Sequence, residues 1–191
     1  MNTPEKRRGT DRPSVKRMAA GAVGIALVFV STRILQFPIP LGYAHLGNAM
    51  ILILSVYFGP GVGMAAGGLG SALADLTSFP QWTLPTLIIK TLMGLICGAV
   101  AGPPPKSSQE AKARRGRRFA ACVAATAEMV LGYTLSGAVL YGSMATGLLQ
   151  VPGLTAEGVV GLLIFYVFSA ALNRMGATER LGLLRDGTGH R

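Results

Sequence analysis

Six apolar runs divide the chain, and each is about as long as a membrane-spanning helix or somewhat shorter. A helix needs roughly 20 apolar residues to cross the hydrocarbon core of a bilayer. The stretches between the runs contain prolines, glycines or basic residues, which end helices and form loops. The pattern therefore predicts an all-α integral membrane protein, a bundle of six transmembrane helices. The runs cover residues 17–35, 45–58, 62–77, 86–102, 119–142 and 156–176.

Polar segments lie at both ends and in the middle of the chain. Residues 1–16 are predicted to form a disordered basic tail, and residues 177–191 a second polar tail. The membrane domain would cover residues 17–176, interrupted by a basic loop at residues 103–118. Residues 36–45, 79–85 and 143–155 are expected to form the loops on the other side of the membrane, the last as a loop or a broken segment.

The positions of the basic residues predict the topology. All but two of the 18 Lys and Arg residues lie in the N-terminal segment, the loop 103–118 or the C-terminal end; the exceptions are Arg33 and Lys90. Six spans would place these three segments on one side of the membrane, and basic segments remain on the cytoplasmic side. Both termini are therefore expected in the cytoplasm.

Composition supports this class of protein and argues against others. Half of the residues are hydrophobic and only 14% are charged, against roughly one quarter in soluble domains. The net charge of +10 could suggest a nucleic-acid partner, but the basic residues lie between apolar runs, as the topology rule requires. Cys97 and Cys122 have no metal-site or disulfide spacing. Without a phosphate loop or a metal-binding motif, we expect no enzyme activity, no catalytic residues, no cofactor and no metal.

Four polar residues inside the apolar runs are candidates for a binding site. With the predicted topology, Asp75 and Lys90 lie at the same depth on consecutive helices, and Asn48 opens the second run. Ionisable groups in a bilayer face the protein interior or a wet cavity. Asp75 and Lys90 could pair with each other or line a cavity. Glu128 could line the same cavity or form a hydrogen bond between helices.

Aromatic and small residues carry two further expectations. Trp82 and Tyr43 lie in outer loops, where they would either anchor the protein at the membrane surface or cover the mouth of a cavity. Ala22 and Ala26 form a small-xxx-small pair in the first run, as Gly63 and Gly67 do in the third. Such pairs let helices approach closely, within the chain or with a partner helix.

Three segments resemble the S components of energy-coupling factor (ECF) vitamin transporters, in the riboflavin-type and hydroxymethylpyrimidine-type group. The segments are "HLGNAMILILSVYFGPGVGMAAGGLGSALADL", "PQWTLPTLIIKTLMGLICG" and "AEMVLGY". The resemblance implies a six-helix subunit of a bacterial or archaeal plasma membrane that captures a vitamin or precursor from outside. It also implies docking on a T subunit driven by two cytoplasmic ATPases, with Ala22 and Ala26 facing the T subunit.

The resemblance also gives a candidate substrate site. Asn48, Asp75, Lys90 and Glu128 would line an outward-facing pocket, with Trp82 and Tyr43 near its mouth. Related proteins often carry Asn and Gln after the Pro-Gly that precedes the last helix, where this chain has Leu154 and Glu157. A carboxylate at residue 157 would favour a ligand with hydrogen-bond donors or positive charge. A stand-alone small-molecule permease or channel is the first alternative, and a small membrane enzyme the second.

Overall fold

The computed structural model describes residues 15–34, 36–39 and 42–178. The two tails predicted at the ends of the chain lie largely outside these residues. The described part contains six helices of 12 residues or more, and each corresponds to one predicted apolar run. They are α1 (Val15–Ile34), α2 (Gly47–Phe58), α3 (Pro60–Ser78), α4 (Thr83–Ala101), α6 (Arg115–Leu140) and α8 (Val151–Arg174).

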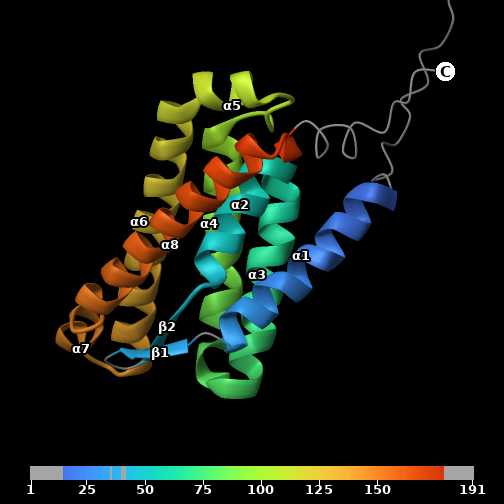
Figure 1. Ribbon diagram of the computed structural model, residues 1–191. Helices are drawn as coiled ribbons and strands as arrows, with labels where there is room; N and C mark the ends of the chain where they lie inside the picture. The colour runs from blue at the N-terminus through green and yellow to red at the C-terminus, as the bar shows by residue number, and fades with distance from the viewer. Residues whose placement is uncertain (1–14, 35, 40–41, 179–191) are drawn as a thin grey trace, which may run out of the picture.

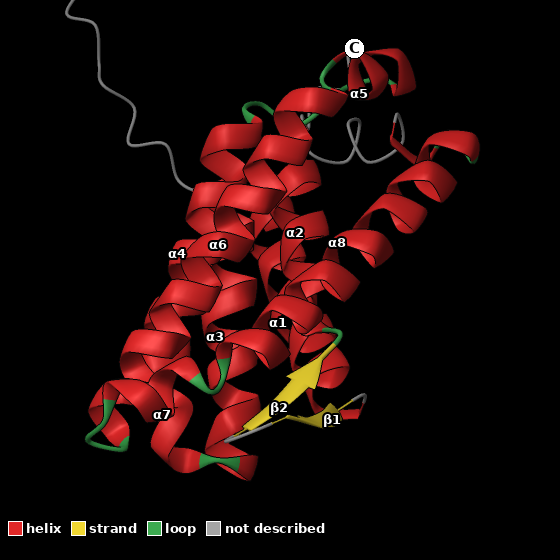
Figure 2. Cartoon of the chain, turned by 90° about the vertical axis from the view of Figure 1, so that its left-hand side faces the viewer, coloured by secondary structure: helices red, strands yellow, loops and turns green. Residues whose placement is uncertain are grey.

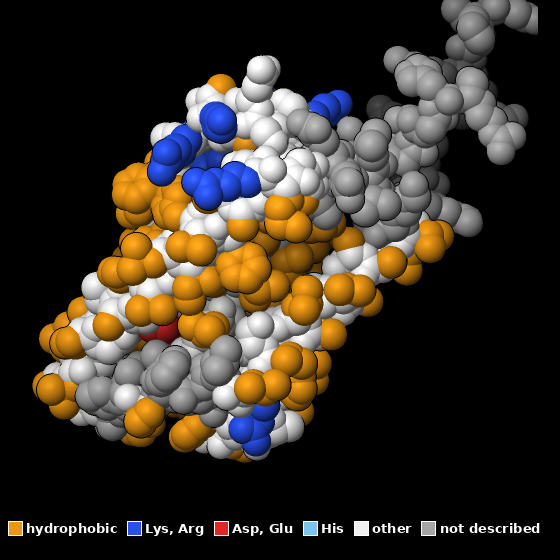
Figure 3. All heavy atoms as spheres, in the orientation of Figure 1, with side chains coloured by type: hydrophobic (Ala, Val, Ile, Leu, Met, Phe, Trp, Pro, Cys, Tyr) orange, Lys and Arg blue, Asp and Glu red, His pale blue; other side chains and the backbone are white. Residues whose placement is uncertain are grey.

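Within the described part of the chain, three segments are long and apolar enough to cross a membrane, namely Pro80–Ala101, Arg115–Leu140 and Met144–Arg174. Met18–Ile34 and Gly47–Phe58 are apolar but shorter. Large hydrophobic side chains cover much of the outer surface of the helices, which Figure 3 shows as a broad orange area. This exposed surface is what a membrane protein presents to lipid, where a soluble protein would carry charge.

Short elements replace three of the predicted loops. Residues predicted as the first outer loop form an antiparallel hairpin of β1 (Gln36–Ile39) and β2 (Gly42–His45), in which Gln36 pairs with His45. The 3-10 helix η1 (Pro80–Trp82) joins α3 to α4. The basic loop contains α5 (Ser108–Ala113), whose first turn is capped by the Ser107 side chain.

The segment predicted as a loop or broken helix at residues 143–155 is mostly helical. It forms α7 (Met144–Leu148) and the first residues of α8. Pro152 lies in the first turn of α8, where a proline is tolerated because the N–H that it lacks would have no helical partner. The proline therefore begins the last helix, and the expected start of that helix at residue 156 was several residues too late.

Glycines bring α3 and α4 into backbone contact, as the small-residue pair in the third run predicted. A Cβ added to Gly94 would lie 2.4 Å from the carbonyl of Gly63, and one added to Gly67 would lie 2.7 Å from the carbonyl of Lys90. Both distances are too short for any side chain, so only glycine allows these helices to pack so closely. The core between them includes Ile51, Ile89 and Met93.

The two ends of the helix bundle differ in charge and structure. Figures 1 and 2 show α5 with the start of α6 and the end of α8 at one end, and the β-hairpin, α7 and η1 at the other. We call the first the basic end and the second the hairpin end. Arg33, in the last turn of α1, lies three residues before β1 and therefore near the hairpin end. The segments of the basic end, from the residues before α5 to the start of α6 and at the end of α8, carry Lys106, Lys112, Arg114, Arg115, Arg117, Arg118 and Arg174.

Candidate functional site

A chain of buried hydrogen bonds joins α2, α4 and α8. Lys90 Nζ donates to Asn48 Oδ1 at 2.5 Å, and Asn48 Nδ2 donates to Glu157 Oε1 at 2.7 Å. Asn48 and Lys90 are fully buried, and Glu157 is 5% exposed. The Met129 sulfur of α6 accepts from both Lys90 Nζ at 3.1 Å and Asn48 Nδ2 at 3.2 Å. Four helices therefore meet at one polar cluster inside the bundle.

Local sequence explains why these side chains meet. Asn48 lies in the first turn of α2, where the chain enters the bundle from the hairpin. Gly161 of α8 lies beside it, and a Cβ there would come within 3.1 Å of the Asn48 Cβ. The close contact of Gly67 with the Lys90 backbone holds α4 against α3 on the other side of the cluster. Gly161 of α8 and Gly67 of α3 thus allow the helices to pack closely around the long polar side chains of the cluster.

His45, the last residue of β2, extends the cluster toward the hairpin end. Its Nδ1 accepts a hydrogen bond from the Gly47 N–H at 3.1 Å, so the neutral ring carries its proton on Nε2. Nε2 lies 3.6 Å from Glu157 Oε1. Burial lowers the pKa of His45 well below its ordinary value, and the positive charge of Lys90 lowers it further. His45 is therefore expected to stay neutral at physiological pH.

A second set of polar side chains lies beside the first. Thr86 Oγ1 hydrogen-bonds Asp75 Oδ2 between α4 and α3, and it lies 2.9 Å from the Tyr133 hydroxyl of α6. The Lys90 ammonium lies 5.1 Å from the centre of the Tyr133 ring, within reach of a cation–π interaction. The Tyr133 side chain thus touches both sets, and together they form one polar site between the helices.

Aromatic rings close this site at the hairpin end. The Trp82 ring centre lies 5.7 Å from that of Tyr133 and 6.3 Å from that of Tyr141. Trp82 is only 6% exposed, whereas a tryptophan that anchors a protein in lipid headgroups would reach the surface. Of the two roles expected for Trp82, its position agrees with the cover of an internal site. The side chain of Tyr43 lies outside what the structure describes.

The remaining predicted residues take different positions. Asp75 and Lys90 both belong to the polar site. Asp75 accepts a hydrogen bond from Thr86, and Lys90 donates one to Asn48. Glu128 is half-buried on α6, and its Oε2 has no hydrogen-bond partner. Ala22 and Ala26 lie exposed on α1, far from the polar cluster in sequence and on the outside of the bundle.

Five residues of the site were missed by the sequence analysis, although helical spacing points to some of them. Thr86 lies four residues before Lys90, and Met129 four residues before Tyr133, so each pair shares a helix face. Gln150 packs with Trp82 against Gly137 of α6. It carried no signal in the sequence, because it precedes a helix that was expected to start later. The missed residues are His45, Thr86, Met129, Tyr133 and Gln150.

The chemistry of the site suits the binding of a small polar molecule. It combines one ammonium group, carboxylates, an amide, hydroxyls and aromatic rings, all largely screened from solvent. Within the described residues, no group of three or more His, Cys, Asp or Glu could hold a metal ion. The fold and these side chains therefore define a helical membrane protein with a buried polar cluster between its helices.

Comparison with known families places the chain more narrowly. It matches the family described as "ECF-type riboflavin transporter, S component" over residues 12–174, and it belongs to this family. The proteins of the family are transporter components rather than enzymes. The resemblance found in the sequence is thereby confirmed, as is the expectation that the protein is not an enzyme.

Individual relatives occur in both archaea and bacteria. An uncharacterized protein of Pyrococcus woesei is 41% identical over 117 residues, which are 60% of this chain and 74% of that protein. A UPF0397 protein of Streptococcus agalactiae is 30% identical over 92 residues, which are 46% of this chain and 50% of that protein. The chain thus spans about half the length of the streptococcal relative.

Proposed function

We infer that the protein is the substrate-binding S component of an ECF-type importer, which captures a vitamin or vitamin precursor from outside the cell. The observation that carries this function is the buried cluster of Asn48, Lys90 and Glu157 inside a chain of this family. Burying two ionisable side chains among apolar helices is costly, and such groups in membrane proteins mark substrate or ion sites.

Unpaired donors near the cluster indicate what the ligand offers. Trp82 Nε1 and Gln150 Nε2 are buried and have no hydrogen-bond partner, and both side chains pack against Gly137 of α6. Buried donors without partners are rare in native proteins. A planar heteroaromatic ligand, such as the isoalloxazine ring of riboflavin, would supply acceptors to these donors and stack on the nearby aromatic rings. Glu157 and Glu128 would accept hydrogen bonds from its N–H groups.

The polar site lies toward the hairpin end, and this end would face the outside of the cell. The basic end would face the cytoplasm, because Lys and Arg are retained on that side of a membrane. Six spans, with both termini in the cytoplasm of a bacterial or archaeal cell, satisfy this arrangement. A ligand would enter between the hairpin and α7, and Trp82 would cover it.

The outer face of α1 is the proposed docking surface for a T subunit, which two cytoplasmic ATPases would drive. Ala22 and Ala26 are exposed there, one helical turn apart. Ala22 lines a groove formed with Ile25, Phe58, Pro60 and Ala65, which α1 makes with the start of α3. Small exposed residues let another helix approach closely, so a helix of the T subunit would fit against this face.

The test is to identify the small molecules that the purified full chain retains. Mass spectrometry of the extract should release a vitamin-like heteroaromatic compound, and titration with riboflavin and related vitamins should show saturable binding. The function is refuted if no such compound is released and none of these vitamins binds. Co-purification with a T subunit and two ATPases would separate an ECF S component from a stand-alone permease.

A further inference from the structure

A second cluster of charged side chains lies at the basic end, away from the polar site. It surrounds a cavity of about 370 Å³ between α5, α6 and α8. This volume falls within the roughly 300–1,000 Å³ of small-molecule sites. Ser108 of α5 donates a hydrogen bond to the Asn173 carbonyl of α8 at 3.2 Å, which ties the two elements together at one side. The polar lining includes Lys112, Arg115, Arg118, Arg174, Tyr166 and Ser169.

Among the described residues, the charges that line this cavity are all of one sign. Four of these side chains are Lys or Arg, and none of the described lining residues is Asp or Glu. The nearby carboxylate of Glu110 is bound to Arg114, at 2.7 Å, and to the Lys106 backbone N–H. Within the described lining, no carboxylate therefore compensates the positive charge of the basic side chains.

Arg118 is the deepest of these cations. It is only 5% exposed; its Nη1 donates to the Ala111 carbonyl at 3.3 Å, and its guanidinium lies 5.3 Å from the centre of the Tyr57 ring. Its Nη2 has no hydrogen-bond partner. A guanidinium can donate five hydrogen bonds, and a buried one without an anion is costly. The side chain is therefore built to receive a negatively charged group.

Two hydroxyl groups beside Arg118 are unpartnered as well. Ser169 Oγ, from a side chain that is 8% exposed, and the Tyr166 hydroxyl are buried without hydrogen bonds. Arg115 lies over the Tyr166 ring at 5.9 Å and holds a second guanidinium near the cavity. Guanidinium and hydroxyl donors converging on one space match the several acceptor oxygens of a phosphate group.

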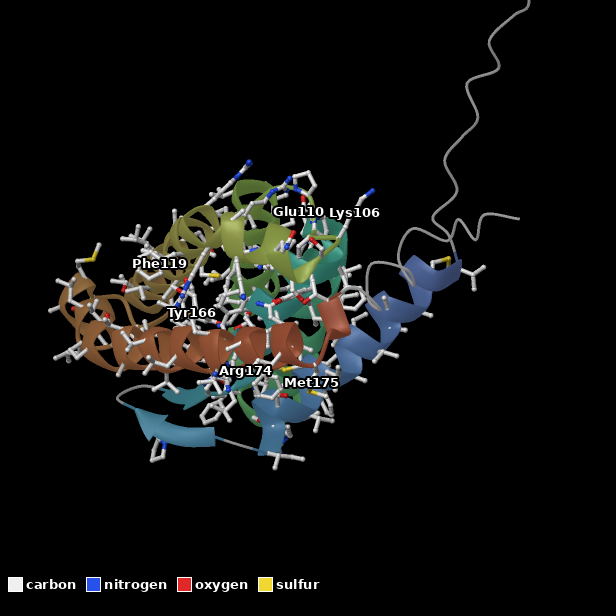
Figure 4. All side chains as sticks on the ribbon, turned by 45° about the horizontal axis from the view of Figure 1, so that its top comes forward. Lys106, Glu110, Phe119, Tyr166, Arg174 and Met175 are labelled. Carbon is white, nitrogen blue, oxygen red and sulfur yellow. The ribbon has the colours of Figure 1, made fainter. Side chains whose placement is uncertain are left out.

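The surroundings favour a phosphate that is carried by a lipid. Figure 3 shows the basic side chains directly above a wide hydrophobic surface. Figure 4 shows Tyr166 of α8 and Phe119 of α6 side by side, and their ring centres are 6.1 Å apart. Phe119 is 53% exposed, so an acyl chain could pack against it below the headgroup. Basic pockets between membrane helices on the cytoplasmic side recognise anionic headgroups.

We propose that the cavity between α5, α6 and α8 binds the phosphate of an anionic phospholipid, with Arg118, Arg115 and Ser169 as donors. The lipid would tie α5 and α8 to α6 across the cavity that the three helices share. This site is separate from the transported ligand and does not depend on which vitamin the protein carries.

The test uses the purified, delipidated full chain. Dioleoyl-phosphatidylglycerol, dioleoyl-phosphatidylcholine and inorganic phosphate are added separately, and thermal unfolding and native mass spectrometry report stabilisation and bound lipid. Phosphatidylglycerol should bind and raise the unfolding temperature, and the other two should not. Arg118→Gln and Arg115→Gln should each weaken phosphatidylglycerol binding roughly tenfold, as expected for loss of a charged hydrogen bond.

Arg117→Gln is the matched control, because it removes the same charge at the same end but outside the cavity. Arg117 is exposed and its Nε donates to the Val100 carbonyl at 2.6 Å. Equal loss of binding in Arg117→Gln would overturn the proposal in favour of diffuse surface charge. Equal stabilisation by inorganic phosphate would overturn the assignment to a lipid, and equal binding of phosphatidylcholine would overturn recognition of net charge. If Arg118→Gln does not fold, the exposed Arg115 still gives the decisive comparison.

Discussion

Lys90 and Asn48, 42 residues apart in the sequence, are joined inside the bundle by a hydrogen bond of 2.5 Å from Lys90 Nζ to Asn48 Oδ1. Asn48 uses both ends of its amide, since Oδ1 accepts from the cation and Nδ2 donates to the Glu157 carboxylate. A neutral side chain thus links a buried ammonium to a buried carboxylate. A ligand that replaces one of these bonds would find the other partner already oriented.

Substitution of Asn48 should therefore affect both folding and binding. Asn48→Ala removes the acceptor of Lys90 and the donor to Glu157, and we expect a loss of about 3 kcal/mol in stability, since buried charged groups lose hydrogen bonds. Vitamin binding should weaken in the same variant. Thermal unfolding in detergent checks the first effect, with Gln109→Ala, which truncates an exposed amide side chain on α5, as control. Similar losses in both variants would contradict a special role for Asn48.

The hydroxyl of Thr86 offers a smaller and cleaner test. Thr86→Val keeps the shape of the side chain but removes the hydrogen bonds to Asp75 and to the Tyr133 hydroxyl, and we expect a loss of roughly 1–3 kcal/mol in stability. Thr83→Val is the matched control, because the buried Thr83 Oγ1 has no hydrogen-bond partner, and it should leave stability nearly unchanged. Chemical unfolding of the two variants side by side measures the difference. A larger loss for Thr83→Val would show that the hydrogen bond contributes little.

Glycine contacts between α3 and α4 predict a steric effect. A Cβ at Gly94 would lie 2.4 Å from the Gly63 carbonyl, so Gly94→Ala should force the helices apart and lower stability by at least ~2 kcal/mol. A Cβ at Gly61 meets nothing within 4 Å, and Gly61→Ala should be neutral or slightly stabilising in its helix. Unfolding temperatures of the two purified variants provide the measurement. An unaffected Gly94→Ala would show that the helix contact yields easily.

Glu128 tests the extent of the ligand site. Its Oε2 is buried and unpartnered, so the carboxylate is available to a ligand. We expect Glu128→Ala to weaken vitamin binding roughly tenfold, the effect of one hydrogen bond to a charged group. Glu110→Ala, at the basic end, should leave affinity unchanged. Equal affinity of wild type and Glu128→Ala in a titration with the true ligand would remove Glu128 from the site.

The small residues on α1 separate docking from binding. Ala22→Leu and Ala26→Leu should abolish cellular uptake by blocking a partner helix, while the purified variants bind the vitamin as wild type does. Ala127→Leu, at an exposed position on α6, is the control and should keep uptake. Radiolabelled vitamin uptake and titration of the purified proteins measure the two steps. Normal uptake by both α1 variants would place the docking surface elsewhere.

The residues of the candidate site could be predicted only in part. Asp75, Lys90 and Asn48 stand out because a charged or amide side chain in an apolar run is costly to bury unless it has a polar partner. The predicted topology also places the three residues at a similar depth in the membrane. The partners of these residues could not be predicted. Lys90 donates a hydrogen bond to Asn48, which lies 42 residues away in the sequence. The Asn48 amide in turn donates to Glu157, which lies 109 residues further along the chain. Those choices depend on the rotation and spacing of whole helices.

The sequence by itself determined the positions of the helices, the polar residues within them and the basic end. These follow from local hydrophobicity and charge, which act within a segment regardless of its neighbours. Only the tertiary structure decided that Trp82 is buried, that residues 36–39 pair with residues 42–45, and that Arg118 faces a cavity with an unused donor. Each of these depends on which helices meet, and that is set by close packing at a few glycines together with hydrogen bonds between residues far apart in the chain.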